Sequence, residues 1–124
     1  MAHALVVDDS RAVRRLLAQS LHGLGYEVTE AENGAVALHA LHASPSPVQL
    51  ILTDWNMPEM NGLDLLKAVR DTPEYGSVPV LMITTETEMN NIAAALEAGA
   101  NEYIMKPFTQ EILADKLRLA GAQV

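Results

Sequence analysis

Two hydrophobic periodicities alternate along the chain. Short apolar runs of strand length occur five times, and each is followed by apolar positions three and four residues apart, as on one face of a helix. The predicted strands are Ala4–Val7, Tyr26–Ala31, Gln49–Thr53, Val78–Ile83 and Glu102–Met105. The predicted helices begin after Ser10, at Asn33 or Gly34, at Leu63, near Met89 and after Thr109; they end near Leu24, Ala43, Arg70, Ala98 and Leu119.

Local signals support these boundaries. Ser10 can accept a hydrogen bond as the N-cap of the first helix, and Gly25 suits the left-handed position just past its end. Phe108 and Leu113 flank Thr109 at the spacing of a hydrophobic staple, which predicts the start of the last helix. The segment 44–47, with two prolines, predicts a turn because proline continues neither a helix nor a strand.

Strands that are apolar on both faces and separated by helices predict an α/β fold. The sheet is expected to be parallel, with right-handed crossovers and helices on both of its faces. No repeat or low-complexity tract remains outside this pattern. We therefore expect residues 1–124 to form a single domain without an output domain.

Composition narrows the functional classes. The chain has no cysteine, which excludes a disulfide framework and a thiolate metal site. Its formal net charge of −8 argues against nucleic-acid binding, which depends on lysine and arginine. The first residues show no secretory signal, and the apolar runs are far shorter than the about 20 residues of a membrane helix. We expect a cytoplasmic protein without membrane insertion.

Polar residues follow four of the predicted strands. They are Asp8 and Asp9 after the first, Asp54 after the third, Thr84 after the fourth and Lys106 after the fifth. Ligands of open parallel sheets bind at the carboxyl ends of the strands, so these side chains are expected to share one site. Each residue alone would suggest only a cap or a surface charge. Together they predict an acidic pocket.

Three carboxylates in one pocket require a cation. Each close pair repels by about 4 kcal/mol at an effective dielectric of about 20. An all-oxygen, carboxylate-rich site suits Mg²⁺. Beside such a site, Asp54 could attack phosphorus and form an acyl phosphate, while Lys106 supplies positive charge and Thr84 a hydroxyl.

These motifs resemble the receiver domain of two-component response regulators. The resemblance rests on Asp8-Asp9, the segment Asp54-Trp55-Asn56-Met57-Pro58, Thr84, Tyr103 and Lys106-Pro107-Phe108, and it covers the whole chain. It implies a flavodoxin-like (βα)5 doubly wound parallel sheet of five strands in the order 2-1-3-4-5. The segment from Asp54 to Pro58 is most similar to free-standing receivers of the chemotaxis type.

The resemblance also implies residue roles. Asp54 would be the phosphoacceptor, and Asp9, Asp54 and the backbone carbonyl of Asn56 would bind Mg²⁺, with Asp8 acting through a water molecule. Lys106 would pair with the phosphoryl group or with Asp54, and its peptide bond to Pro107 would be cis. In addition, Thr84 and Tyr103 would be switch residues, and Asn56 and Glu86 would tune dephosphorylation.

The resemblance implies a phospho-accepting switch protein that assists its own phosphorylation and dephosphorylation, rather than an ordinary enzyme. Its partners would be a histidine kinase, of the chemotaxis type, and a target such as the flagellar switch, contacted as a monomer through the fourth helix, fifth strand and fifth helix. A phosphorelay intermediate or a phosphate sink of the same fold remains open. A haloacid-dehalogenase-type phosphatase is a remote alternative, because those enzymes carry their nucleophile on the first strand.

Overall fold

The computed structural model describes residues 2–44, 46–55, 57, 60–85 and 92–122. Its strands are β1 (Ala2–Val7), β2 (Tyr26–Ala31), β3 (Leu50–Asp54), β4 (Val80–Thr84) and β5 (Glu102–Met105). Its helices are α1 (Arg11–Gly23), α2 (Gly34–Ala43), α3 (Gly62–Asp71), the short 3₁₀ helix η1 (Pro73–Tyr75), α4 (Ile92–Glu97) and α5 (Gln110–Leu119). Within the described ranges, no helix is both long and apolar enough to cross a bilayer.

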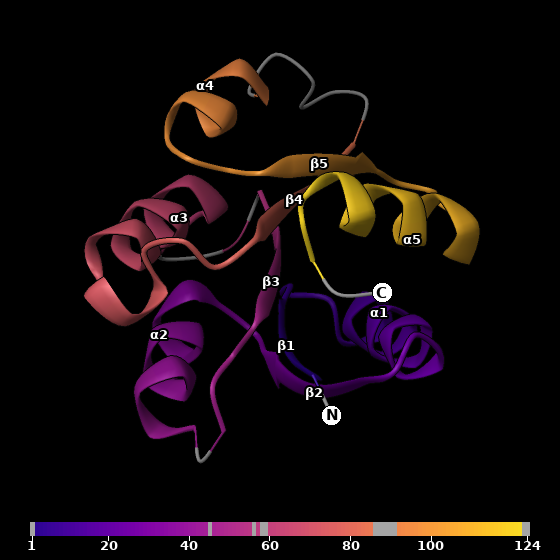
Figure 1. Cartoon of the computed structure of the whole chain (residues 1–124), viewed down its shortest axis with the longest axis horizontal. Helices are drawn as coiled ribbons and strands as arrows, with labels where there is room; N and C mark the ends of the chain where they lie inside the picture. The colour runs from indigo at the N-terminus through magenta and orange to yellow at the C-terminus, as the bar shows by residue number, and fades with distance from the viewer. Residues whose placement is uncertain (1, 45, 56, 58–59, 86–91, 123–124) are drawn as a thin grey trace.

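The five strands form one parallel sheet in the order β2-β1-β3-β4-β5. This order confirms the predicted fold, and Figure 1 shows the strands crossing the centre of the molecule between the helices. Strand β1 lies between β2 and β3, with Val7 opposite Ala31 on one side and Thr53 on the other. The carboxyl ends of β1 and β3 therefore lie side by side.

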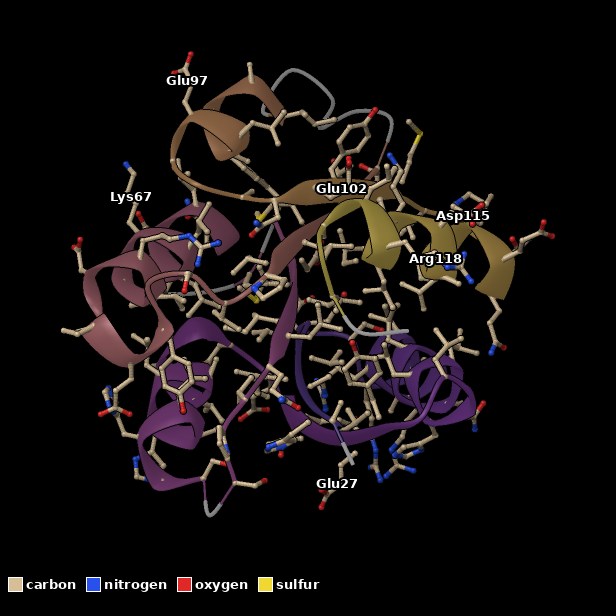
Figure 2. The ribbon with its side chains drawn as sticks, in the orientation of Figure 1. Glu27, Lys67, Glu97, Glu102, Asp115 and Arg118 are labelled. Carbon is tan, nitrogen blue, oxygen red and sulfur yellow. The ribbon has the colours of Figure 1, made fainter. Side chains whose placement is uncertain are left out.

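The sheet separates two apolar cores. Helices α1 and α5 cover one face, and α2, α3 and α4 cover the other (Figure 1). Side chains alternate between the faces along β1: Leu5 and Val7 belong to the core under α2 and α3, whereas Ala4 and Val6 belong to the core under α1 and α5. Charged side chains such as Glu27, Lys67 and Glu97 point into solvent (Figure 2).

The predicted caps are confirmed. The Ser10 hydroxyl accepts from the Val13 amide at 3.3 Å, and Thr109 accepts from the Ile112 amide at 3.1 Å. Gly25 has a φ of 94°, the left-handed region that favours glycine. Each of these devices completes hydrogen bonds that a helix end leaves open.

Several predicted boundaries were wrong. Strand β4 begins at Val80 rather than Val78, because Pro79 has no amide hydrogen to give to the ladder and the Val78 amide instead donates to the Tyr75 carbonyl at 3.3 Å. The helix η1 was not predicted. Strand β3 runs one residue further than expected, which places Asp54 inside the sheet. The predicted start of the fourth helix near Met89 lies outside the described residues.

Candidate functional site

Asp54 is the last residue of β3, at the centre of the sheet edge. It pairs with Ile83 of β4, and the residue is 7% exposed. The Trp55 amide donates to the Asp54 carboxylate Oδ1 at 2.9 Å and also to the Ile83 carbonyl at 3.2 Å. The carboxylate is thus held by its own strand end and is largely buried.

Asp8 and Asp9 follow β1 directly. Asp8 is 1% exposed, and its carboxylate Oδ1 accepts from the Ser10 amide at 2.8 Å, so the helix start and the acid stabilise one another. Asp9 is exposed to solvent. The adjacent acids therefore have different environments, with one fixed beneath the pocket and one at its rim.

The three carboxylates come together as predicted. Oxygen atoms of Asp8, Asp9 and Asp54 lie within 4.8 Å of one another. The Lys106 ammonium lies 3.2 Å from Asp8 Oδ2 and 3.5 Å from Asp54 Oδ1, which compensates one of the three negative charges. Two charges remain uncompensated among these four side chains. Such an all-oxygen donor set with surplus negative charge fits a divalent cation.

The β5–α5 connection places Lys106 in this position. The Lys106 amide donates to the Thr84 carbonyl at 2.8 Å, which extends the pairing of β4 and β5 by one residue. The Lys106–Pro107 peptide bond is cis, as the resemblance implied. The lysine side chain then lies along the edge of the sheet toward Asp8 and Asp54.

The two predicted switch residues lie in different surroundings. Thr84 ends β4 and is 2% exposed, with its hydroxyl donating to the Thr85 carbonyl at 3.1 Å. Tyr103 on β5 is half-buried, and the Lys116 ammonium lies 4.2 Å from the centre of its ring. Lys116 also pairs with Glu102 at 3.2 Å. A cation over the ring stabilises the observed position of Tyr103.

Two predicted site residues, Asn56 and Glu86, lie outside the described residues. Their assigned contributions to metal binding and dephosphorylation stay predictions. The roles assigned to the other site residues also stay predictions, although the structure brings Asp8, Asp9, Asp54 and Lys106 together.

Two residues near the pocket make contacts that the sequence did not predict. A side chain at Gly62 would collide with the backbone carbonyl of Asp54, and the Gly62 amide donates to the Trp55 carbonyl at 2.9 Å. Gly62 therefore allows α3 to begin directly against the acceptor strand. Arg14 donates to the Asp8 carbonyl at 2.7 Å. A glycine shortly after a strand end was a usable signal, whereas an arginine in a helix was not.

Comparison with known proteins gives the class. A family model described as the response regulator receiver domain matches residues 4–118. The chain therefore belongs to the response regulator receiver domain family, a class of signalling switch proteins. Its four clustered side chains come from the ends of β1, β3 and β5, the edge at which parallel sheets bind ligands.

Several of the similar proteins are named as chemotaxis proteins. The chain is 49% identical over 116 residues to the chemotaxis protein CheY1 of Helicobacter pylori, and the match spans 93% of each chain. It is 43% identical to the chemotaxis protein CheY of Pseudomonas aeruginosa, over 91% of this chain and 90% of that protein. The structure of Vibrio cholerae CheY4 superposes with a TM-score of 0.87 at 37% identity, covering 95% of this chain and 97% of that one.

Proposed function

We propose that the chain is a stand-alone, phosphorylation-activated response regulator of chemotaxis, with Asp54 as its phosphoacceptor. The observation that carries this proposal is the cluster of three carboxylates and one lysine at the sheet edge. Folding alone does not explain why three carboxylates have oxygens within 4.8 Å of one another, because their mutual repulsion is unfavourable. Family membership supports the same role, as do similar proteins named for chemotaxis.

Mg²⁺ is the proposed cofactor. Asp9, Asp54 and the backbone carbonyl of Asn56 would hold it directly, and Asp8 would hold one of its water molecules. When bound, the ion would neutralise carboxylate charge and the charge of an incoming phosphoryl group. Asp8 is suited to the indirect role, because its two oxygens already accept from the Ser10 amide and the Lys106 ammonium.

The proposed reaction is phosphoryl transfer to Asp54. A carboxylate oxygen of Asp54 attacks phosphorus, a P–O bond forms, and the bond from phosphorus to the donor breaks with its electron pair leaving on the donor. With a histidine kinase the bond that breaks is P–N, and the imidazole is released. The Lys106 ammonium lies 3.5 Å from the acceptor carboxylate, so its positive charge can stabilise the negative charge of the transferred phosphoryl group. In this sense the chain assists its own phosphorylation.

The proposed output is a change of surface. Thr84 would turn its hydroxyl toward the phosphoryl group, and Tyr103 would move inward behind it. Phosphorylation can shift the two states only through interactions that differ between them. The affected surface would be formed by α4, β5 and α5, and its target would be a protein such as the flagellar switch.

Other outputs are less well supported. A phosphorelay intermediate or a phosphate sink would use the same pocket, but relatives that are 43% and 49% identical are named as chemotaxis proteins. A haloacid-dehalogenase-type phosphatase is not favoured, since the receiver model matches residues 4–118 and the acceptor stands on the third strand. A cytoplasmic monomer that does not bind nucleic acid completes the proposal.

Labelling by a small phosphodonor tests the acceptor. Wild-type protein with Mg²⁺ and radiolabelled acetyl phosphate should acquire an acid-stable, base-labile label. Asp54→Asn should abolish it, whereas Asp64→Asn, which removes an exposed carboxylate from α3, should leave it unchanged. Equal labelling of the Asp54→Asn protein would contradict the assignment.

A further inference from the structure

Arg14 lies on α1, behind the acidic pocket, and makes two kinds of contact. Its Nη1 donates to the backbone carbonyl of Asp8 at 2.7 Å, and its Nε lies 3.4 Å from Glu30 Oε1 near the end of β2. Only 14% of the arginine side chain is exposed. The Nε contact is an ion pair without hydrogen-bond geometry, so the bond to Asp8 is the better defined of the two.

The carbonyl that Arg14 contacts belongs to the peptide group joining the two acids. Asp8 is also held through its amide, which donates to the Ala31 carbonyl at 3.1 Å, and through its carboxylate, which contacts Ser10 and Lys106. The Asp9 carboxylate has no hydrogen bond or ion pair with another described residue. Its position therefore depends on the backbone before it. Arg14 contacts the carbonyl of that backbone from outside the pocket.

Charge and position predict opposite consequences for this arginine. A cation next to an acidic pocket opposes the binding of a second cation, so charge alone predicts tighter Mg²⁺ binding when Arg14 is removed. Position predicts weaker binding, because Asp9 loses its defined orientation. The neighbouring Arg15 serves as a control that separates the effect of charge from the effect of position. It also pairs with Glu30, at 3.7 Å, yet its side chain is 59% exposed.

We infer that Arg14 is a positioning residue for metal binding and phosphoryl transfer: its guanidinium holds the Asp8–Asp9 peptide group and thereby places the Asp9 carboxylate toward a divalent cation. Glu30 balances the buried charge of the arginine and orients it from the other side. The inference rests on the proposed function, since it concerns the same pocket. Groups that hold a metal ligand in place typically contribute about 10–100-fold to metal affinity.

Titration with Mg²⁺ tests this inference, with the fluorescence of Trp55 as the signal. Arg14→Gln should weaken Mg²⁺ binding by about tenfold. The control Arg15→Gln should change it by less than about twofold, because it removes an exposed charge. The weaker Mg²⁺ binding should also slow the phosphorylation of Arg14→Gln by acetyl phosphate. At saturating Mg²⁺, its phosphorylation rate should return most of the way to the wild-type rate. Unchanged or tighter binding by Arg14→Gln would overturn the inference.

Two variants that keep the positive charge, Arg14→Lys and Arg15→Lys, test the inference if Arg14→Gln does not fold. Arg14→Lys keeps the charge but not the planar guanidinium, so it should weaken Mg²⁺ binding by an intermediate amount, whereas Arg15→Lys should not. Amide hydrogen exchange at Asp9 and Ser10 in metal-free buffer should be faster in Arg14→Lys than in Arg15→Lys. Equal affinity and equal exchange in the two variants would overturn the inference.

The outcome for the wild-type protein separates the two proposals. Absence of Mg²⁺ binding and labelling in the wild type would remove the proposed function. Normal binding and labelling in both the wild type and the Arg14 variants would remove the role of Arg14 alone.

Discussion

Two polar clusters lie near opposite ends of β1, and they are built differently. Near the amino ends, His3 is 5% exposed, with Nε2 2.7 Å from the Thr29 hydroxyl and Nδ1 3.1 Å from the Ser46 hydroxyl. At the carboxyl ends, three carboxylates share one lysine. We call these the amino-end cluster and the carboxyl-end pocket.

The difference between the two clusters distinguishes a structural role from a functional one. The amino-end cluster pairs donors with acceptors, so its burial costs little. The carboxyl-end pocket keeps a surplus of negative charge that folding alone would not select. A buried polar group is therefore not itself a sign of function, whereas uncompensated like charge is such a sign. Substitutions in the two regions should consequently affect stability and metal binding in different combinations.

The largest expected effect is the loss of Lys106. Lys106→Met leaves Asp8 and Asp54 without their ammonium partner, which should lower the free energy of unfolding of the metal-free protein by about 3 kcal/mol. Urea unfolding with and without Mg²⁺ measures this change, and Mg²⁺ should restore part of it. Lys116→Met removes a more exposed pair and should cost less than about 1 kcal/mol. Equal losses in the two variants would contradict the account.

A change at the amino-end cluster should affect stability alone. His3→Leu leaves the Thr29 hydroxyl and the Ser46 backbone carbonyl without the imidazole, which should cost about 2 kcal/mol. The Mg²⁺ affinity should stay that of the wild type, because the carboxyl-end pocket is unchanged. Urea unfolding and Mg²⁺ titration of the same sample test both parts. A large loss of Mg²⁺ affinity would show that the two regions are coupled.

A substitution of Asp9, at the pocket rim, should raise the free energy of unfolding instead of lowering it. Asp9→Asn removes one of three neighbouring charges and should stabilise the metal-free protein by about 1 kcal/mol, the Coulomb energy of unit charges about 4 Å apart in water. It should also weaken Mg²⁺ binding. Urea unfolding compares it with Glu27→Gln, an exposed carboxylate on β2 that should have little effect. Destabilisation by Asp9→Asn would contradict the repulsion argument.

The smallest effect concerns alkaline pH. Burial raises the pKa of Tyr26 above its ordinary value of 10.0, because the core disfavours the phenolate. Above pH 10 the unfolded chain releases this proton before the folded chain does, so the contribution is complete below that pH and is lost as the pH rises through the folded pKa. Tyr26→Phe should flatten the decline of stability above about pH 10. Urea unfolding at several pH values measures this decline. The same decline of the free energy of unfolding with pH in the wild type and in Tyr26→Phe would contradict the prediction.

The fold was predictable because its local signals agree. The apolar runs gave each strand to within a few residues, and Ser10 and Thr109 cap the helices that they were expected to cap. Asp8 and Asp54 were brought to one edge by topology alone, since consecutive parallel strands end at the same side of the sheet. Local pattern and global fold thus favour the same structure.

The misses have two causes, a local proline that limits a strand and contacts between separate elements. The start of β4 is set by Pro79 and by Arg70 on α3, which donates to the Val78 carbonyl at 2.8 Å. Arg14 and Arg15 are adjacent on one helix, and the sequence alone assigned neither of them a contact with the pocket. Only the tertiary structure shows that Arg14 is mostly buried against Asp8 while Arg15 remains in solvent.

The central claim is that the carboxyl-end pocket accepts a phosphoryl group on Asp54 beside Mg²⁺. Trp55 is the only tryptophan of the chain, and its amide donates to the Asp54 carboxylate. Its fluorescence should change saturably with Mg²⁺ and change again when acetyl phosphate is added, with the second change requiring Mg²⁺ and absent in Asp54→Asn. A second change that occurs equally in Asp54→Asn, or none in the wild type, would contradict the claim.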